Sequence, residues 1–181
     1  MRYIPERSSV LNSTTLYIFS GLPGCGKTSI AKLLAGRMKA AYLRVDTIEQ
    51  ALRELCSIEI QGEGYRLAYR VASDILHSGV SVVADSCNPI LLTRLEWERV
   101  ALDAGARHVN IEITCSDIQE HRTRVETRSP TVLGLRLPTW QEVQSREYHD
   151  WTSPRITIDT SGRSMLECVE ELASKIPGGL R

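Results

Sequence analysis

The chain contains one segment whose residue types and spacing could cradle a phosphate chain. Residues 21–28 read Gly-Leu-Pro-Gly-Cys-Gly-Lys-Thr, the full pattern of a phosphate-binding loop, or P-loop. Its glycines permit backbone dihedrals and close approaches that a Cβ would block, so successive N–H groups can point at phosphate oxygens. The helix expected after the loop adds the positive end of its dipole. We expect nine residues to bind a nucleoside triphosphate, ATP with Mg²⁺: Gly21, Leu22, Pro23, Gly24, Cys25, Gly26, Lys27, Thr28 and Ser29.

Three residues of this loop are considered individually. Lys27 should reach the β- and γ-phosphates, and the Thr28 hydroxyl should ligate Mg²⁺. Cys25 could be an oxidation-sensitive thiol beside positive dipoles, or merely a small side chain at a variable loop position.

The surroundings of the motif are those that a P-loop needs. Residues 16–19 form an apolar β-type run before it, and Ile30, Leu33 and Leu34 recur at helical spacing after it. A glycine-rich turn with a chance lysine is the alternative, and this context disfavours it.

Strand and helix patterns alternate along the rest of the chain. Strands are expected at 41–45, 80–84, 109–113 and 156–158, and helices at 65–76, 88–104, 116–129, 139–149 and 164–176. The unbroken apolar run at 80–84 is typical of a strand covered on both faces. The alternation predicts an α/β fold of three layers, with a mostly parallel five-stranded sheet flanked by helices and a small helical lid. We expect a flexible leader at 1–15 and one domain at 16–177, with the lid at about 116–140.

Three helix ends have cap signatures. Gly79 stands where a C-cap glycine belongs, and Asn88 before Pro89 looks like an N-cap. Ser116 with Gln119 forms a capping-box pattern.

Composition bounds the class of protein. The 181 residues are 42% apolar and 24% charged, as in a soluble globular domain, and 22 basic residues balance 22 acidic ones. A strong positive field for nucleic acid or anionic lipid is therefore not expected, nor is a membrane span. The five cysteines lie scattered, which favours reduced thiols in the cytoplasm over a zinc site or disulfides. The four histidines lack metal-ligand spacing and are expected at the surface.

From residue 16 to 176 the order of motifs resembles the small P-loop kinases, which include gluconate kinase, chloramphenicol phosphotransferase, polynucleotide 5′-kinase and the zeta-toxin kinases. Only the P-loop is specific alone. The others gain weight from their order: Val45-Asp46, Val82-Val83-Ala84-Asp85 with Asn88-Pro89, Arg124-Val125-Glu126-Thr127-Arg128, and Ile158-Asp159-Thr160-Ser161.

The resemblance implies roles for two aspartates. Asp46 would accept the proton of the acceptor hydroxyl as it attacks the γ-phosphate. Alternatively Asp46 only caps the next helix, with Glu49 completing a capping box, and the two roles are compatible. Asp85 matches the Walker-B position, where a carboxylate helps hold Mg²⁺, unless it is a capping or loop aspartate. Ser86 follows it instead of the glutamate found in AAA-type ATPases, which weakens the interpretation as an ATP-driven motor.

The helix at 116–129 carries several arginines. Arg124 and Arg128 share a face, and both could reach the triphosphate when the lid closes, stabilising charge on the transferring phosphoryl group. The competing interpretation is a solvated face of ordinary ion pairs, in which Arg124 pairs with Glu120 and Arg122 with Glu126.

The acceptor wall has only weak candidates. Besides Asp46 these are Tyr65, Asn88 and Arg94, with Arg66 and Trp97 beside them, and each has an ordinary packing, capping or surface alternative. The turn at 159–161 resembles the one that borders adenine in related kinases, and Trp140 and Trp151 are expected to pack the lid and the last helices.

The leading hypothesis is an ATP- and Mg²⁺-dependent phosphotransferase whose acceptor is a hydroxyl of a small metabolite, nucleoside or nucleotide. One alternative is a switch or ATPase subunit acting through a protein partner, although no Asn-Lys-x-Asp motif for guanine is present. Another is a kinase of nucleic-acid 5′-ends, which the neutral net charge disfavours. The acceptor and the oligomeric state cannot be read from the sequence.

Overall fold

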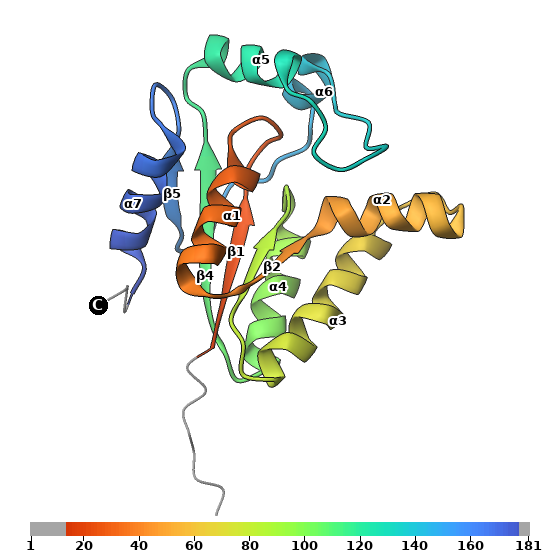
Figure 1. Cartoon of the computed structure of the whole chain (residues 1–181), viewed down its shortest axis with the longest axis vertical. Helices are drawn as coiled ribbons and strands as arrows, with labels where there is room; N and C mark the ends of the chain where they lie inside the picture. Colours follow the sequence, from red (N-terminus) through yellow and green to blue (C-terminus); the bar gives the residue numbers. More distant parts are fainter. Residues whose placement is uncertain (1–13, 178–181) are drawn as a thin grey trace, which may run out of the picture.

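A parallel five-stranded sheet forms the centre of the protein (Figure 1), in a computed structural model that describes residues 14–177. The strands are β1 (Thr15–Ser20), β2 (Ala41–Arg44), β3 (Val82–Asp85), β4 (Arg107–Thr114) and β5 (Ile156–Asp159). Their order is β2-β3-β1-β4-β5, and all four pairings are parallel. The P-loop strand β1 therefore lies in the middle of the sheet, as expected for a strand made wholly of buried residues.

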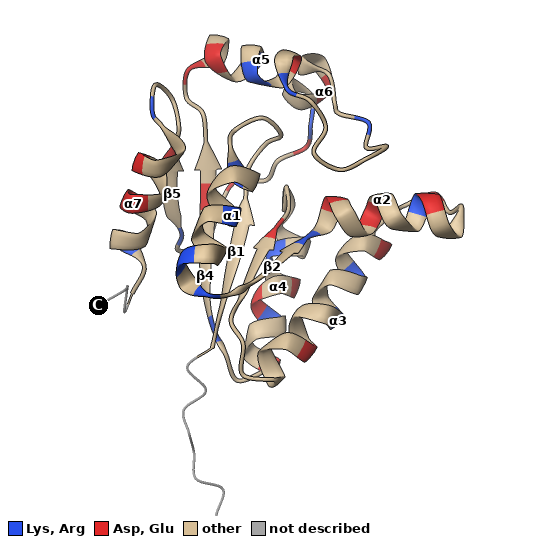
Figure 2. Cartoon of the chain, in the orientation of Figure 1, with Lys and Arg blue, Asp and Glu red and all other residues tan. Residues whose placement is uncertain are grey.

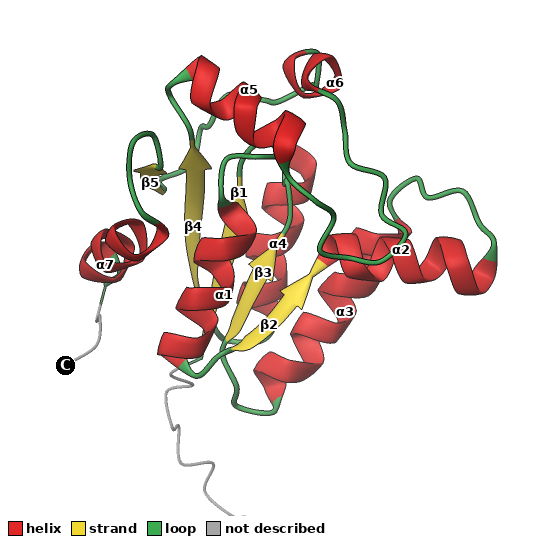
Figure 3. Ribbon diagram, turned by 45° about the horizontal axis from the view of Figure 1, so that its top comes forward, coloured by secondary structure: helices red, strands yellow, loops and turns green. Residues whose placement is uncertain are grey.

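Helices cover both faces of the sheet (Figure 3). They are α1 (Lys27–Met38), α2 (Val45–Cys56), α3 (Glu63–His77), α4 (Leu91–Asp103), α5 (Ile118–Thr127), α6 (Trp140–Gln144) and α7 (Met165–Lys175). Alternate residues of β1 serve two cores: Phe19 packs with α1 and α7, whereas Ile18 packs with α3 and α4. The expected three-layer α/β fold is confirmed.

Two helices lie over the carboxyl ends of the strands (Figure 1), where α5 leads into a long loop and then α6. The helix expected at 139–149 is shorter than predicted. Thr139 and Glu142 form a capping box that starts it, but it ends at Gln144. The residues beyond are bonded elsewhere: the N–H of His149 donates to the carbonyl of Pro89, and the carbonyl of Asp150 accepts from Arg94 on α4.

The structure corrects two of the expected caps and confirms one. Gly79 follows α3 with a φ of 89°, as a C-cap glycine should. Asn88 is not an N-cap, since it has a left-handed φ of 47° and α4 starts only at Leu91, after Ile90. The cap of α5 is Asp117, whose Oδ1 accepts from two backbone amides, and not Ser116.

Most of the predicted leader lies outside the described residues, which begin at 14. Thr15 belongs to β1 instead of a leader, and its side chain is buried. In the described part of the chain, no helix has both the length and the apolar character of a membrane span.

Candidate active site

The phosphate cradle joins β1 to α1, and α5 packs closely over it. Gly24 has a φ of 89°, and a Cβ there would lie 2.5 Å from Cγ2 of Val125 on α5. A Cβ on Gly21 would overlap the carbonyl oxygen of Ile113 on β4. These glycines therefore serve both the loop conformation and the close packing around it.

Lys27 starts α1 and is only 9% exposed. Its Nζ donates to the carbonyl of Leu22 at 3.2 Å, so the side chain folds back across the loop. Burial alone would lower the pKa of Lys27, but the ionisable groups around it, the Asp85 and Asp46 carboxylates among them, raise it. The ammonium group therefore stays charged in the place where a P-loop lysine meets phosphates.

Asp85 ends β3 and is 3% exposed. The Tyr42 hydroxyl donates to its Oδ2 at 2.6 Å, and Nε of Arg44 lies 3.9 Å from the same oxygen. Tyr42 and Arg44 lie two positions apart on the neighbouring strand β2, which explains why both reach this carboxylate. In residues 14–177 no hydrogen bond is made to Oδ1.

Asp46 lies in the first turn of α2 with its side chain 46% exposed. Arg44 donates to Oδ2 twice, from Nη2 at 3.1 Å and from Nε at 3.3 Å. The capping interpretation of Asp46 is wrong, because Arg44 occupies the N-cap position and no side chain caps the helix. The second carboxylate oxygen is left for another partner.

Arg128 follows α5 directly, and its guanidinium group is partly unsatisfied. Nε and Nη2 are buried without a hydrogen-bond partner among the described residues. Burial lowers the pKa of Arg128, and the charge of Asp46 opposes that shift. A buried unpaired guanidinium group is costly, so this geometry suits an anion that arrives later.

The other two arginines of α5 differ from Arg128. Arg124 donates to Thr160 and to Glu120, and it also lines the pocket. Arg122 pairs with Glu126 at the surface, as the ion-pair interpretation expects.

These side chains line one pocket of about 730 Å³ at the carboxyl ends of the strands. Ligands of open α/β sheets bind at such ends. Seven basic residues contribute to its lining, namely Lys27, Arg44, Arg53, Arg124, Arg128, Arg136 and Arg146. Three acidic ones do, namely Asp46, Glu49 and Asp85. This excess is local, because acidic and basic residues are mixed along the helices elsewhere (Figure 2).

Three expected acceptor residues do not line the pocket. The Tyr65 hydroxyl accepts from the N–H of Asn88 at 2.9 Å, while Asn88 Nδ2 donates to the Ser20 hydroxyl. Arg94 is buried, donates to the carbonyls of Asn88 and Pro89, and lies 4.1 Å from the Trp151 ring. Their side chains hold the turn after β3, so their assignment to the acceptor wall is corrected. Trp97 lies in the core.

His121 was expected at the surface, and this expectation is wrong. The ring is buried, its Nε2–H donates to the Pro23 carbonyl at 2.9 Å, and it stacks edge-on against Trp140. Trp140 thus packs against α5, within the segment expected to form the lid. Sequence reasoning also missed Arg44, although its place at a strand end two residues before Asp46 was a usable signal.

The thiol of Cys25 is buried, and burial raises its pKa. A reactive thiolate needs exposure and a lowered pKa, so the structure favours the small-side-chain interpretation.

Fold and pocket together define a P-loop nucleotide-binding enzyme. The chain matches the family model described as an AAA domain over residues 16–134, and it belongs to this family. It is 29% identical to shikimate kinase of Thermobifida fusca (strain YX), over 92% of this chain and 98% of that protein.

Solved structures of kinases share the fold. A putative kinase from Chloroflexus aurantiacus has a TM-score of 0.69 at 20% identity, covering 91% of this chain and 100% of that one. The Mycobacterium tuberculosis APS kinase in complex with AMPPNP and APS has a TM-score of 0.66 at 20% identity, covering 90% and 96%. A Sinorhizobium meliloti gluconokinase reaches 0.63 at 13% identity, covering 89% of each chain. The chain is thus one of the small P-loop kinases, ATP-dependent enzymes that phosphorylate small molecules, as its motifs predict.

Proposed function

We propose that the protein moves the γ-phosphate of Mg-ATP to a hydroxyl of a small anionic metabolite, with Asp46 as the base. The observation that carries this proposal is the shared pocket of Lys27, Asp46 and the unpaired Arg128 guanidinium. A triphosphate on the loop would have its γ-phosphate between Lys27 and Asp46, so the phosphate faces a carboxylate that can hold an attacking hydroxyl.

The residues at the loop fit a magnesium ion. Thr28 and Asp85 both line the pocket and offer the hard oxygen ligands that Mg²⁺ takes. Bound there, the ion would neutralise phosphate charge. Tyr42 and Arg44 hold Asp85 by Oδ2, which leaves Oδ1 as the candidate donor.

The protein side of the reaction follows from these positions. Asp46 orients the acceptor hydroxyl through its second oxygen and takes the proton as the new O–P bond forms. Lys27 and Arg128 stabilise the charge on the transferring phosphoryl oxygens, while α5 and α6 limit the access of water. ADP and the phosphorylated acceptor are the products.

The acceptor is inferred to carry negative charge. Beyond Lys27, Arg124 and Arg128 at the nucleotide, the pocket lining includes Arg146 and also Arg53 of α2, which pairs with Glu49. Arg146 forms no ion pair among the described residues. Guanidinium groups recognise carboxylate and phosphate well. The acceptors named for similar proteins, shikimate, gluconate and APS, are all anions.

The test is ADP formation and phosphorylated product from a panel of shikimate, gluconate, APS and neutral polyols. We expect turnover with an anion and not with a polyol. Asp46→Asn should lower kcat by about 10²- to 10⁴-fold, with little change in AMPPNP affinity. Asp74→Asn, on the exposed face of α3, is the matched control and should be silent.

Other outcomes would overturn the proposal. Hydrolysis of ATP that ignores every acceptor and rises only with a protein partner would favour the switch or ATPase alternative. Labelling of oligonucleotide 5′-ends would favour the nucleic-acid kinase.

A further inference from the structure

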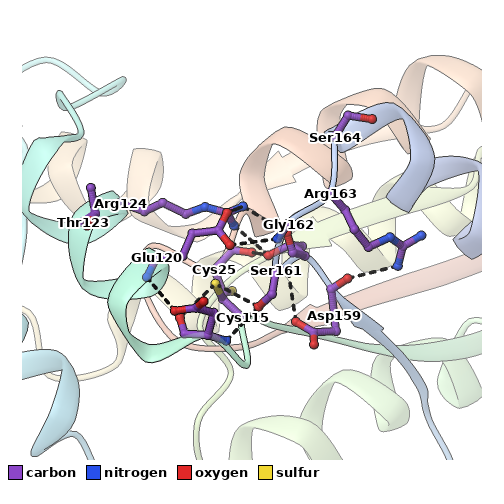
Figure 4. A network of polar contacts seen from close by, with 12 residues as sticks. Cys25, Cys115, Glu120, Thr123, Arg124, Asp159, Ser161, Gly162, Arg163 and Ser164 are labelled. Carbon is purple, nitrogen blue, oxygen red and sulfur yellow. Dashed lines mark hydrogen bonds and ion pairs between the residues drawn. The ribbon is translucent and has the colours of Figure 1, made fainter.

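The start of α5 is bonded to the turn that follows β5 (Figure 4). The backbone N–H and the hydroxyl of Ser116 both donate to the Asp159 carboxylate. On the next turn of chain, the N–H of Gly162 donates to Oε2 of Glu120 at 2.8 Å. The start of the expected lid is therefore bonded to the end of the edge strand β5 and the turn after it.

Thr160 lies at the centre of this network and is fully buried. Its hydroxyl accepts a hydrogen bond from Nη1 of Arg124 at 2.7 Å. The same Oγ1 lies 2.9 Å from the carbonyl of Cys25 in the P-loop and 3.0 Å from that of Thr114 on β4. A hydroxyl has one hydrogen to share between two carbonyls, so it ties α5, the P-loop and β4 to one point.

Arg124 is held on two sides. Nη2 donates to the carbonyl of Thr160 at 3.0 Å and to Oε1 of Glu120 at 2.5 Å, in addition to the Nη1 bond to the Thr160 hydroxyl. Arg128, one turn later, has buried and unpartnered nitrogens. Arg124 therefore lies on α5 with its guanidinium group held, whereas Arg128 lies just after the helix with part of its guanidinium group unpartnered among residues 14–177.

The body of α5 also rests on the P-loop. His121 donates to the Pro23 carbonyl, and the Val125 side chain occupies the space above Gly24. Since packed contacts resist gradual sliding, these contacts are expected to couple the position of α5 to that of the loop.

We propose that Thr160 is a positioning residue for ATP, which holds Arg124 against the P-loop as a fixed wall of the nucleotide site. The moving lid then begins at Arg128 instead of near residue 116. This inference rests on the proposed function, because it takes ATP to be the ligand of the pocket.

The first experiment measures the affinity of the full chain for Mg-AMPPNP by calorimetry, without any acceptor. Thr160→Val keeps the shape and removes the hydroxyl, and it should weaken binding by about 5- to 20-fold. Thr160→Ser keeps the hydroxyl and should bind within about twofold of wild type. Thr157→Val, on the exposed face of β5, is the control for a threonine lost from this strand.

A thermodynamic cycle separates positioning from general stability. Arg124→Gln should weaken AMPPNP binding in the wild-type background and less in the Thr160→Val background, since the hydroxyl that holds Nη1 is already lost. Additive losses would overturn the proposal, and so would equal affinity of Thr160→Val and wild type.

A second measurement needs no variant and stays valid if Thr160→Val fails to fold. In hydrogen exchange of the wild type, AMPPNP should slow the amides of 128–139 strongly and those of 118–125 little, because α5 is already held. Equal slowing of both segments would overturn the proposal. If the wild type binds no AMPPNP at all, the proposed function fails instead.

Discussion

The nitrogens of Arg128 show how this site prepares for its ligand. A buried polar group without a partner costs about 1–3 kcal/mol, and here two guanidinium nitrogens are in that state. The oxygens of a phosphoryl group would supply the missing partners. The unpaired guanidinium group thus destabilises the free protein locally, and binding and transition-state formation would relieve this. Such a loss of stability in favour of activity is common at active sites.

Replacement of Arg128 should therefore separate activity from stability. Arg128→Gln should lower kcat by on the order of 10²-fold or more, because the charge on the transferring oxygens loses its partner. Its melting temperature should stay equal or rise. Steady-state kinetics and thermal unfolding measure the two effects. Arg122→Gln, on α5 with an exposed ion pair, should change neither; equal kinetic losses in both variants would contradict the assignment.

Asp159 gives a pH test at the same scale. The hydroxyl and N–H of Ser116, with the amide of Ser161, lower the pKa of Asp159 to about 2. A carboxyl whose pKa falls on folding stabilises the fold above its unfolded pKa of about 3.9, and loses that contribution as the pH falls toward about 2. The difference in melting temperature between wild type and Asp159→Asn should shrink as the pH falls from about 5 to about 2. A difference that does not vary with pH would show that the ionised form is not what stabilises the turn.

At this scale the sequence predicted some residues and not others for a physical reason. Local spacing specifies the P-loop, and the strand ends specify Asp46 and Asp85. Thr160 and His121 act across distances of 135 and 98 residues along the chain, and no local pattern shows such pairings. Arg94 was misplaced because a buried arginine that holds a turn looks like one that faces a ligand.

At the scale of elements, the contact between α5 and the P-loop matters most. The loop conformation and the helix position are coupled at Gly24, since its φ is positive and Val125 fills the space beside it. Either feature alone would forbid a side chain at this position.

Gly24→Ala should lower the free energy of unfolding by about 1–3 kcal/mol and weaken AMPPNP binding strongly. Adding Val125→Ala should recover the stability lost through the steric clash of the new Cβ with Val125. The loss that comes from backbone strain at the positive φ should remain. Unfolding in urea and calorimetry measure both. Gly36→Ala lies on α1 with open space around its Cβ, so it should raise stability by about 0.5–1 kcal/mol. If Val125→Ala recovers none of the free energy of unfolding lost in Gly24→Ala, the contact with α5 is not the cause of that loss.

The expected elements agreed with the fold where periodicity was strong and failed at helix ends. Caps depend on single hydrogen bonds, and the sequence offers neighbouring candidates, as at Ser116 and Asp117. The helix expected to reach residue 149 is shorter, and the N–H of His149 bonds to the carbonyl of Pro89, a tertiary contact that propensity cannot show.

At the scale of the whole molecule, the net charge of the chain is zero, but the charge of the pocket lining is positive. Equal numbers of basic and acidic residues cancel over the chain, yet the pocket lining is predominantly basic. An anionic ligand should therefore be attracted only at short range, within about one Debye length of the pocket.

Salt should accordingly weaken the binding of Mg-AMPPNP more than that of a neutral nucleoside. Raising ionic strength from about 0.05 to about 0.5 M should lower AMPPNP affinity several-fold and leave adenosine affinity nearly unchanged. Calorimetry at several salt concentrations measures both. Parallel changes for the two ligands would point to an effect on the protein as a whole.

Because Cys25 is buried, alkylation of its thiol can report how often the phosphate loop opens. An alkylating reagent can reach this thiol only when the loop opens, whereas the exposed Cys56 on α2 reacts without delay and calibrates the reagent. The alkylation rate at Cys25, measured by mass spectrometry, then reports loop opening. A nucleotide that holds the loop closed should lower this rate strongly.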